Sequence, residues 1–350
     1  MAALLTLVTE IVTGLGMLGF RDLDRALAAR PAAIVNVTDV EYDRLAAARA
    51  AGSYRDAFEV SWRNGVAFAR AAEGLRGRPP WWIEWKGNHR PPRYEQIPAD
   101  LRIDHVYLVS CKYGSNILTN SSPANLFDLR LADRRQQRLD WFAEVAPDAY
   151  QGFYVACRDW INANLVAAVS LPRRVGDLTA ADRAELKARL PRRLVGRPAE
   201  AYREFAHTVA RASAERWRES LTTPARKEEM LWRLLRLQSA PYFVLGESAD
   251  GTPLRFRVGT PWDFRTRFRL RSFTVAAATD RDQPVVTWQG VVSDGSAERE
   301  VRGHVEVRWS HGRFAQVPEA KVYLDTPHHR VPGYFPLDVG DNGGRLGFGG

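Results

Sequence analysis

Two short runs of β-forming residues between positions 81 and 113 constrain the fold more than any other part of the chain. They are Trp81–Lys86 and Ile103–Lys112, and basic, proline-rich sequence joins them. Successive side chains of a strand point to opposite faces of a sheet, so Glu84 and Lys86 share one face of the first run. The run therefore predicts a strand that carries an acid and a lysine on the same side.

The second run predicts the same arrangement over a longer strand. Asp104 and Lys112 share a face, with Val106, Leu108 and Ser110 between them. The apolar residues indicate that the middle of the strand is buried. Charged groups at the ends of a buried strand are unusual, because a buried charge costs free energy unless it is paired. Metal-dependent phosphodiester cleavage needs carboxylates to hold Mg²⁺ and often uses a lysine near the attacking water, so both runs point to that chemistry.

One known solution places an acid at the start of a strand and an acid-x-lysine unit on the next strand, with a helical glutamate nearby. Over about residues 54–130 the chain resembles, at motif level, this pattern of the PD-(D/E)XK nuclease superfamily. In a first alignment, Asp100 or Asp104 is the first acid, and Ser110-Cys111-Lys112 takes the place of the acid-x-lysine unit. Ser110 then replaces the expected carboxylate, so another acid has to compensate for it.

A second alignment uses Glu84-Trp85-Lys86 as a complete acid-x-lysine unit. Its preceding acid would be Asp56 or Glu59, which both lie on a predicted helix. A merged site is also open, in which Glu84, Asp104 and Lys112 converge from adjacent strands and Glu59 from the helix. The alternative is that all of these are charged positions on an exposed strand face.

The resemblance implies a bound Mg²⁺ or Mn²⁺ ion and a lysine that orients the attacking water. The implied catalytic residues are Lys112, Lys86, Asp104 and Glu84, and the implied metal ligands are Glu59, Glu84, Asp100 and Asp104. A third acid-x-lysine unit, Glu319-Ala320-Lys321, has no acid before it at a fitting spacing. A polar strand edge is the favoured interpretation there.

The distribution of helical and β patterns predicts an α+β protein. Residues 1–170 are expected to form an α/β domain with a restriction-endonuclease-like sheet. Residues 171–240 are charged and helical and are interpreted as a connector, and residues 241–338 as a mostly antiparallel β domain. The glycine-rich residues 339–350 are expected to form a flexible tail.

Arginines alternate with apolar residues in Phe264–Phe273, and two more arginines flank Phe256. On a strand, this pattern buries one face and exposes a row of guanidinium groups, which is easier to explain if phosphates or acidic side chains meet it. The predicted nucleic-acid-binding residues are Arg255, Arg257, Arg265, Arg267, Arg269 and Arg271. The alternative is a solvated strand face with acids from neighbouring strands between the arginines.

The formal net charge of +9 and the isoelectric point of about 9.8 favour a polyanionic partner. The two cysteines form no CxxC pair, which suits a reducing compartment, so a cytoplasmic location is expected. The apolar first twenty residues lack a basic start and contain Glu10, so a core helix is expected there and no membrane association.

The sequence thus predicts a metal-dependent nuclease, of restriction or phage-defence type, that acts on DNA more readily than on RNA. The second hypothesis is a non-catalytic nucleic-acid-binding or scaffold subunit of a larger assembly, with a degenerate nuclease-like domain. Ser110 in the place of a carboxylate favours that second hypothesis. A third is a protein-binding module whose arginines meet an acidic partner subunit.

Overall fold

The computed structural model describes residues 3–87, 99–114, 117–129, 139–164 and 170–338. The chain is an α+β protein that forms two compact units. Unit 1 comprises residues 1–116, 236–267 and 327–350, and unit 2 comprises residues 117–235 and 268–326. The units are therefore interleaved along the chain, whereas the predicted domains were consecutive segments. The predicted tail lies outside the described residues.

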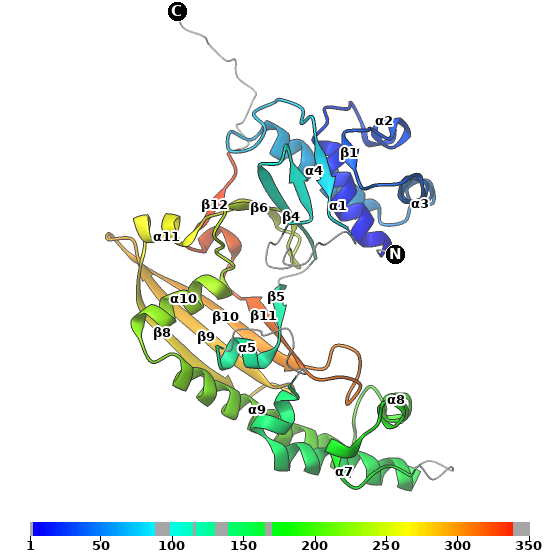
Figure 1. The fold of residues 1–350 in the computed structure, drawn as a ribbon, viewed down its shortest axis with the longest axis vertical. Helices are drawn as coiled ribbons and strands as arrows, with labels where there is room; N and C mark the ends of the chain where they lie inside the picture. The colour runs from blue at the N-terminus through cyan, green and yellow to red at the C-terminus, as the bar shows by residue number, and fades with distance from the viewer. Residues whose placement is uncertain (1–2, 88–98, 115–116, 130–138, 165–169, 339–350) are drawn as a thin grey trace, which may run out of the picture. The chain divides into compact units, whose positions relative to one another are not determined.

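Unit 1 contains a mixed sheet of short strands (Figure 1). Its strands are β1 (Ile34–Val35), β2 (Ile83–Trp85), β3 (Leu101–Ile103), β4 (Tyr107–Tyr113), β6 (Tyr242–Glu247), β7 (Pro253–Val258) and β12 (Tyr334–Pro336), in the spatial order β1-β2-β3-β4-β6-β7-β12. Strands β2, β3 and β4 are antiparallel, and β6 runs parallel to β4. The parallel pair is possible because all of residues 117–235 lie between these two strands in sequence.

Helices of unit 1 cover one face of that sheet. They are α1 (Leu4–Gly16), α2 (Leu23–Ala29), α3 (Asp39–Ala50) and α4 (Arg55–Arg70), and a short helix α11 (Pro261–Arg267) follows β7. α1 and α4 can cross closely because Gly65 has no side chain. A Cβ at that position would lie only 2.1 Å from the Thr13 carbonyl oxygen. Apolar residues of α1, such as Leu7 and Ile11, join Ile83 and Leu101 in the buried core.

The long strand expected over Ile103–Lys112 is interrupted. β3 ends at Ile103, and a tight turn follows in which Asp104 and His105 both have positive φ, 47° and 58°. β4 then pairs antiparallel with β3 and continues to Tyr113. The prediction of one extended strand was wrong because a hairpin turn occupies its beginning, and Asp104 belongs to that turn.

Unit 2 contains an antiparallel sheet and a layer of helices (Figure 1). The strands are β5 (Ile117–Ser121), β8 (Arg269–Ala278), β9 (Val285–Ser293), β10 (Glu298–Arg308) and β11 (Glu319–Leu324), in the order β5-β11-β10-β9-β8. The helices are α5 (Pro123–Phe127), α6 (Trp141–Val145), α7 (Pro147–Asn164), α8 (Ala180–Arg189), α9 (Arg197–Ser220) and α10 (Pro224–Leu234). Short 3₁₀ turns occur at Val175–Asp177 in this unit and at His328–Arg330 in unit 1.

The helices predicted as a connector form most of the helical layer of unit 2. α9 packs against β8 and β9 and also against α7, and its Phe205 stacks on Trp309 with the ring centroids 6.0 Å apart. Side-chain caps begin two of these helices: Thr179 and Asp182 form a capping box for α8, and the Thr223 side chain caps α10. These helices are structural parts of a domain core.

Strands after residue 240 are divided between the two units. β6, β7 and β12 belong to the sheet of unit 1, and β8 to β11 belong to unit 2. The segment Phe264–Phe273, expected to be one strand, contains the end of α11 and the start of β8. Among the helices that the structure describes, none is long and apolar enough to cross a membrane.

Candidate functional site

Asp100 occupies the position immediately before β3, beside β4. Its Oδ2 atom accepts hydrogen bonds from the Cys111 backbone N–H at 2.7 Å and from the Ser110 hydroxyl at 3.3 Å. The Asp100 backbone N–H donates to the Val109 carbonyl at 2.8 Å, which fixes the carboxylate against β4. The acid expected at a strand start and the Ser-x-Lys unit of the next strand are therefore in direct contact.

Lys112 follows on β4 and shares a face with Ser110. Burial and the positive charge of Arg236 lower the pKa of Lys112, whereas the negative charges of Asp100 and Glu10 oppose that shift. A lysine near two carboxylates with a lowered pKa is typical of functional sites. Gly246 of β6 pairs with Lys112 of β4. A Cβ on Gly246 would lie 1.9 Å from the Lys112 carbonyl oxygen, so only glycine allows the two strands to pair this closely.

Glu10 supplies the helical carboxylate near this cluster. It lies on α1 and is 8% exposed, and its Oε2 atom accepts a hydrogen bond from Trp85 Nε1 at 2.6 Å. The sequence prediction gave the helical role to Glu59 and missed Glu10. A single acid within an otherwise apolar helix was the available signal, because a buried carboxylate needs a specific partner.

Glu59 itself lies elsewhere in unit 1. Its Oε1 atom forms an ion pair with Arg49 Nη1 at 3.1 Å, which links α4 to α3. This surface pair contributes little to stability. The structure does not bring Glu59 together with the predicted strand residues, so its expected role as a metal ligand lacks support in the geometry.

Glu84 and Lys86 share a face and contact each other, as the alternation predicts. Lys86 is 2% exposed, and its Nζ atom lies 3.1 Å from Glu84 Oε1. Arg102 Nη2 lies 2.5 Å from the other carboxylate oxygen of Glu84. Burial raises the pKa of Glu84, but Lys86 and Arg102 outweigh burial and leave that pKa below its usual value. Glu84 is therefore an ionised carboxylate whose two oxygens both contact cations.

This ion pair lies directly beside the Asp100 cluster. The Lys86 backbone N–H donates to the Asp100 carbonyl at 2.8 Å across the β2–β3 pair. The two alternative alignments of the sequence thus describe neighbouring parts of one sheet. In the first part a carboxylate is held by a hydroxyl and a backbone N–H, and in the second it is neutralised by two cations.

Asp104 is a structural residue of the hairpin turn. Its carboxylate is 8% exposed, accepts hydrogen bonds from the backbone N–H groups of Trp81 and Trp82 at 3.0 and 3.1 Å, and pairs with Arg78. By the β3–β4 register, Lys112 lies about six residues, or roughly 20 Å, farther along the hairpin. The merged site of Glu84, Asp104 and Lys112 therefore does not form.

The predicted arginines are divided among four settings. Arg255 on β7 donates to Asn64 of α4 at 2.8 Å, so it faces the helices. Arg257 and Arg267 lie over the Phe335 ring, with their guanidinium carbons 4.7 and 4.9 Å from its centroid. Arg265 is exposed on α11. Arg269 and Arg271 lie on β8 in unit 2.

The single ladder of arginines was therefore wrong, because Arg265 and Arg267 are helical. A cap explains the helix: the Thr260 hydroxyl accepts from the Asp263 backbone N–H at 3.1 Å, and Asp263 accepts from the Thr260 N–H at 2.8 Å. Three arginines of α11 and β7 remain in unit 1, and we call them the arginine surface: Arg257, Arg265 and Arg267. Arg257 Nη1 lies 3.5 Å from Asp263 Oδ2, which offsets part of the positive charge. Trp262 on the same helix is 77% exposed.

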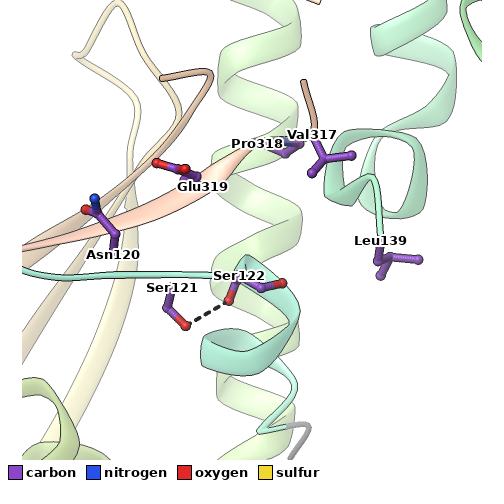
Figure 2. Close-up of a pocket in the computed structure, with 7 residues that line it drawn as sticks. All are labelled: Asn120, Ser121, Ser122, Leu139, Val317, Pro318 and Glu319. Atoms are coloured by element: carbon purple, nitrogen blue, oxygen red, sulfur yellow. Dashed lines mark hydrogen bonds between the residues drawn. The ribbon is translucent and has the colours of Figure 1, made fainter. Parts of the chain in front are cut away.

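The third acid-x-lysine unit borders a pocket of about 210 Å³ in unit 2 (Figure 2). Glu319 lies at one side of this pocket, across from Leu139, and Asn120 and Ser121 line it as well. Glu319 accepts a hydrogen bond from Ser310. Glu319 is the one acid that lines the pocket in the described part of the chain. It begins β11, which pairs with both β5 and β10, so the expectation of a polar strand edge was wrong.

Histidine, cysteine, aspartate and glutamate side chains form no cluster of three or more that could hold a metal ion in the described ranges. Comparisons of the chain with family models, curated proteins and solved structures found no match. The function is therefore argued from the geometry of the site alone.

Proposed function

We propose that unit 1 hydrolyses phosphodiester bonds of nucleic acid with a divalent metal ion, and that Asp100, Glu10 and Lys112 are its working groups. The observation that carries this proposal is the contact of Asp100 with Ser110 and Cys111, two and one residues before a lysine of lowered pKa. Of the two first acids that the sequence left open, the proposal uses Asp100 and not Asp104, and Glu10 takes the place of Glu59.

The strand arrangement supports the proposal. An acid stands at the start of β3, the Ser-x-Lys unit is on the neighbouring β4, and a helix supplies a glutamate. They follow the order of the restriction-endonuclease-like pattern, except that Ser110 stands where that pattern has a carboxylate. The antiparallel β2–β3–β4 arrangement with β6 parallel to β4 provides a mixed sheet on which they lie.

The donor set fits Mg²⁺ or Mn²⁺ through two carboxylates, Asp100 and Glu10. Mg²⁺ commonly uses only one or two protein carboxylates and completes its octahedron with waters and substrate phosphates. Trp85 and Ser110 each orient one of the two acids by a hydrogen bond. When bound, the metal would polarise the phosphoryl group and lower the pKa of a bound water.

Lys112 would activate the attacking water and stabilise the charge of the transition state. Its partial burial lowers its pKa, so its amine gives up a proton more readily than that of a solvent-exposed lysine. A lysine of this kind hydrogen-bonds the attacking water and, when protonated, stabilises the charge that develops on the phosphoryl oxygens. The arginine surface would contribute affinity for the phosphate backbone, and DNA is the proposed substrate.

Cleavage of labelled duplex DNA, single-stranded DNA and RNA with Mg²⁺ or Mn²⁺, compared with EDTA, tests the proposal. We expect wild-type cleavage that EDTA abolishes, and loss of cleavage in Asp100→Asn and Lys112→Met. Glu59→Gln is the matched control, because Glu59 is an acid of unit 1 that pairs with Arg49 away from the cluster. Cleavage that survives in both cluster variants would refute the assignment.

A second candidate function, non-catalytic binding of nucleic acid, is favoured by one observation. Ser110 stands where the nuclease pattern has a carboxylate, and its hydroxyl donates a hydrogen bond to Asp100. A Ser110→Asp variant separates the two functions, since it restores the missing acid. Wild-type binding without cleavage, together with cleavage by Ser110→Asp, would establish a degenerate nuclease site.

A further inference from the structure

His105 on the β3–β4 turn and two tryptophans just before β2 form a group of aromatic side chains that the proposed hydrolytic site does not use. Rings of Trp81 and Trp82 lie 5.2 and 5.3 Å from the ring of His105, centroid to centroid, and 6.1 Å from each other. Trp81 is 60% exposed and Val106 is 73% exposed. We call these four residues the turn platform.

The backbone of the turn has positive φ at two consecutive residues, Asp104 and His105. Two-residue turns of this type prefer asparagine or aspartate followed by glycine, so Asp104 suits its position and His105 stands where glycine is usual. The turn places His105 and Val106 at the exposed tip.

A specific set of bonds keeps that conformation in place. The buried Asp104 carboxylate binds the backbone N–H groups of Trp81 and Trp82 and the Arg78 guanidinium, and the Asp104 N–H donates to the Trp82 carbonyl at 2.8 Å. Asp104 therefore joins the turn to the segment that carries both tryptophans. The aromatic rings are pre-organised relative to each other before any ligand arrives.

The formal net charge of the chain, +9, favours a polyanion. Near the platform, Arg76 is exposed, and Arg78 is half-exposed with its charge offset by the buried Asp104 carboxylate. An open indole face beside exposed guanidinium groups is the arrangement with which proteins stack unpaired bases and hold the adjoining phosphates. Histidine rings also stack on bases.

We propose that the turn platform binds single-stranded nucleic acid by stacking an unpaired base on the exposed Trp81 ring, which His105 supports from an edge-to-face contact. This inference rests on the proposed nucleic-acid function of unit 1 and names the form of substrate that it recognises. A duplex keeps its bases stacked on each other, so the platform would select single-stranded or locally opened substrate.

Fluorescence anisotropy with labelled oligothymidylate, in EDTA so that nothing is cleaved, tests the platform. Trp81→Ala is expected to weaken binding about tenfold, and Trp81→Phe, which keeps an aromatic face, to stay within about twofold of the wild type. Binding of a duplex of equal length should not change. Tyr54→Ala removes another exposed aromatic residue of unit 1 and serves as the control.

Photo-crosslinking with oligonucleotides that contain 4-thiothymidine gives a second readout, which does not depend on variants. Crosslinked peptides that contain Trp81 or His105 would support the platform. Crosslinks confined to other peptides, or equal losses for single strand and duplex in Trp81→Ala, would overturn it. Selective loss in Trp81→Ala without metal-dependent cleavage would refute only the hydrolytic proposal. No binding of either oligonucleotide by the wild type would refute both and indicate a protein partner for the platform.

Discussion

Two aspartates, Asp100 and Asp104, flank the three-residue strand β3, and their carboxylates have different partners. Asp100, before β3, accepts one backbone N–H and one hydroxyl, and it lies within the electrostatic reach of Lys112. Asp104, after β3, accepts two backbone N–H groups and an arginine. The comparison teaches that a carboxylate can serve a turn or a reaction, and that its partners decide which.

The sharpest test of this comparison is the activity of paired variants. We expect Asp100→Asn to lower metal-dependent cleavage by about two to four orders of magnitude, the range of a lost catalytic group. Asp104→Asn keeps an oxygen for the two backbone N–H groups and should retain activity within about threefold. Initial rates on labelled DNA measure both, and equal losses would show that the two acids do not differ in role.

Stability should show the opposite order. Asp104→Ala leaves two backbone N–H groups and Arg78 without their partner, in a turn of positive φ, so we expect about 2–4 kcal/mol of lost unfolding free energy. Urea unfolding measures the loss. Asp43→Ala, which removes only an exposed partner of Arg30, is the control and should cost less than about 1 kcal/mol. A similar small value for Asp104→Ala would contradict its role in bracing the turn.

Substitutions in the arginine surface should have a smaller effect, which is limited to the affinity for DNA. Arg257→Ala with Arg267→Ala should weaken DNA binding about tenfold and reduce the salt slope by roughly one to two units, one for each lost phosphate contact. Anisotropy titrations at several salt concentrations measure the slope. The catalytic rate at saturating DNA should be unchanged. If the salt slope stays that of the wild type, these arginines do not contact phosphates.

The smallest expected effect concerns the cost of burying Lys112. Its pKa is lower in the folded protein than in the unfolded chain, so between the two pKa values the unfolded state binds more protons and wild-type stability rises with pH. Lys112→Met lacks this cost. Its melting temperature should exceed that of the wild type by on the order of a degree or two at neutral pH, and the difference should vanish above the unfolded pKa.

The absence of any such difference at neutral pH would mean that Lys112 is solvated like a surface lysine. Calorimetry over a pH series, with Lys187→Met of unit 2 as a control, separates the two cases. Both measurements are made in EDTA, so that metal binding does not contribute.

The sequence predicted local features of the site better than their combination. Strand alternation placed Glu84 and Lys86 on one face, where they form an ion pair. It failed at Asp104, because the turn there contains no glycine or asparagine to mark it. Only tertiary structure shows that α1 brings Glu10 near Lys112, since nothing in the spacing of these residues relates them.

The helix that divides the arginines was predictable in principle. Thr260 and Asp263 have the same spacing as Thr179 and Asp182, which form the capping box of α8, and Pro261 stands at the first helical position. The alternation of arginine with apolar residues outweighed that signal. The interleaving of the two units could not be predicted, because strands of both sheets have similar composition.

The interleaved order of the units also determines when the chain can finish folding during its synthesis. β4, which carries Lys112, gains its neighbour β6 only after more than a hundred further residues, and β12 comes later still. Until then one edge of β4 has unpaired backbone groups, which are a template for wrong pairing. Neither sheet is complete before β11 and β12 emerge, so we expect the nascent protein to depend on chaperones, and C-terminal truncations to be degraded.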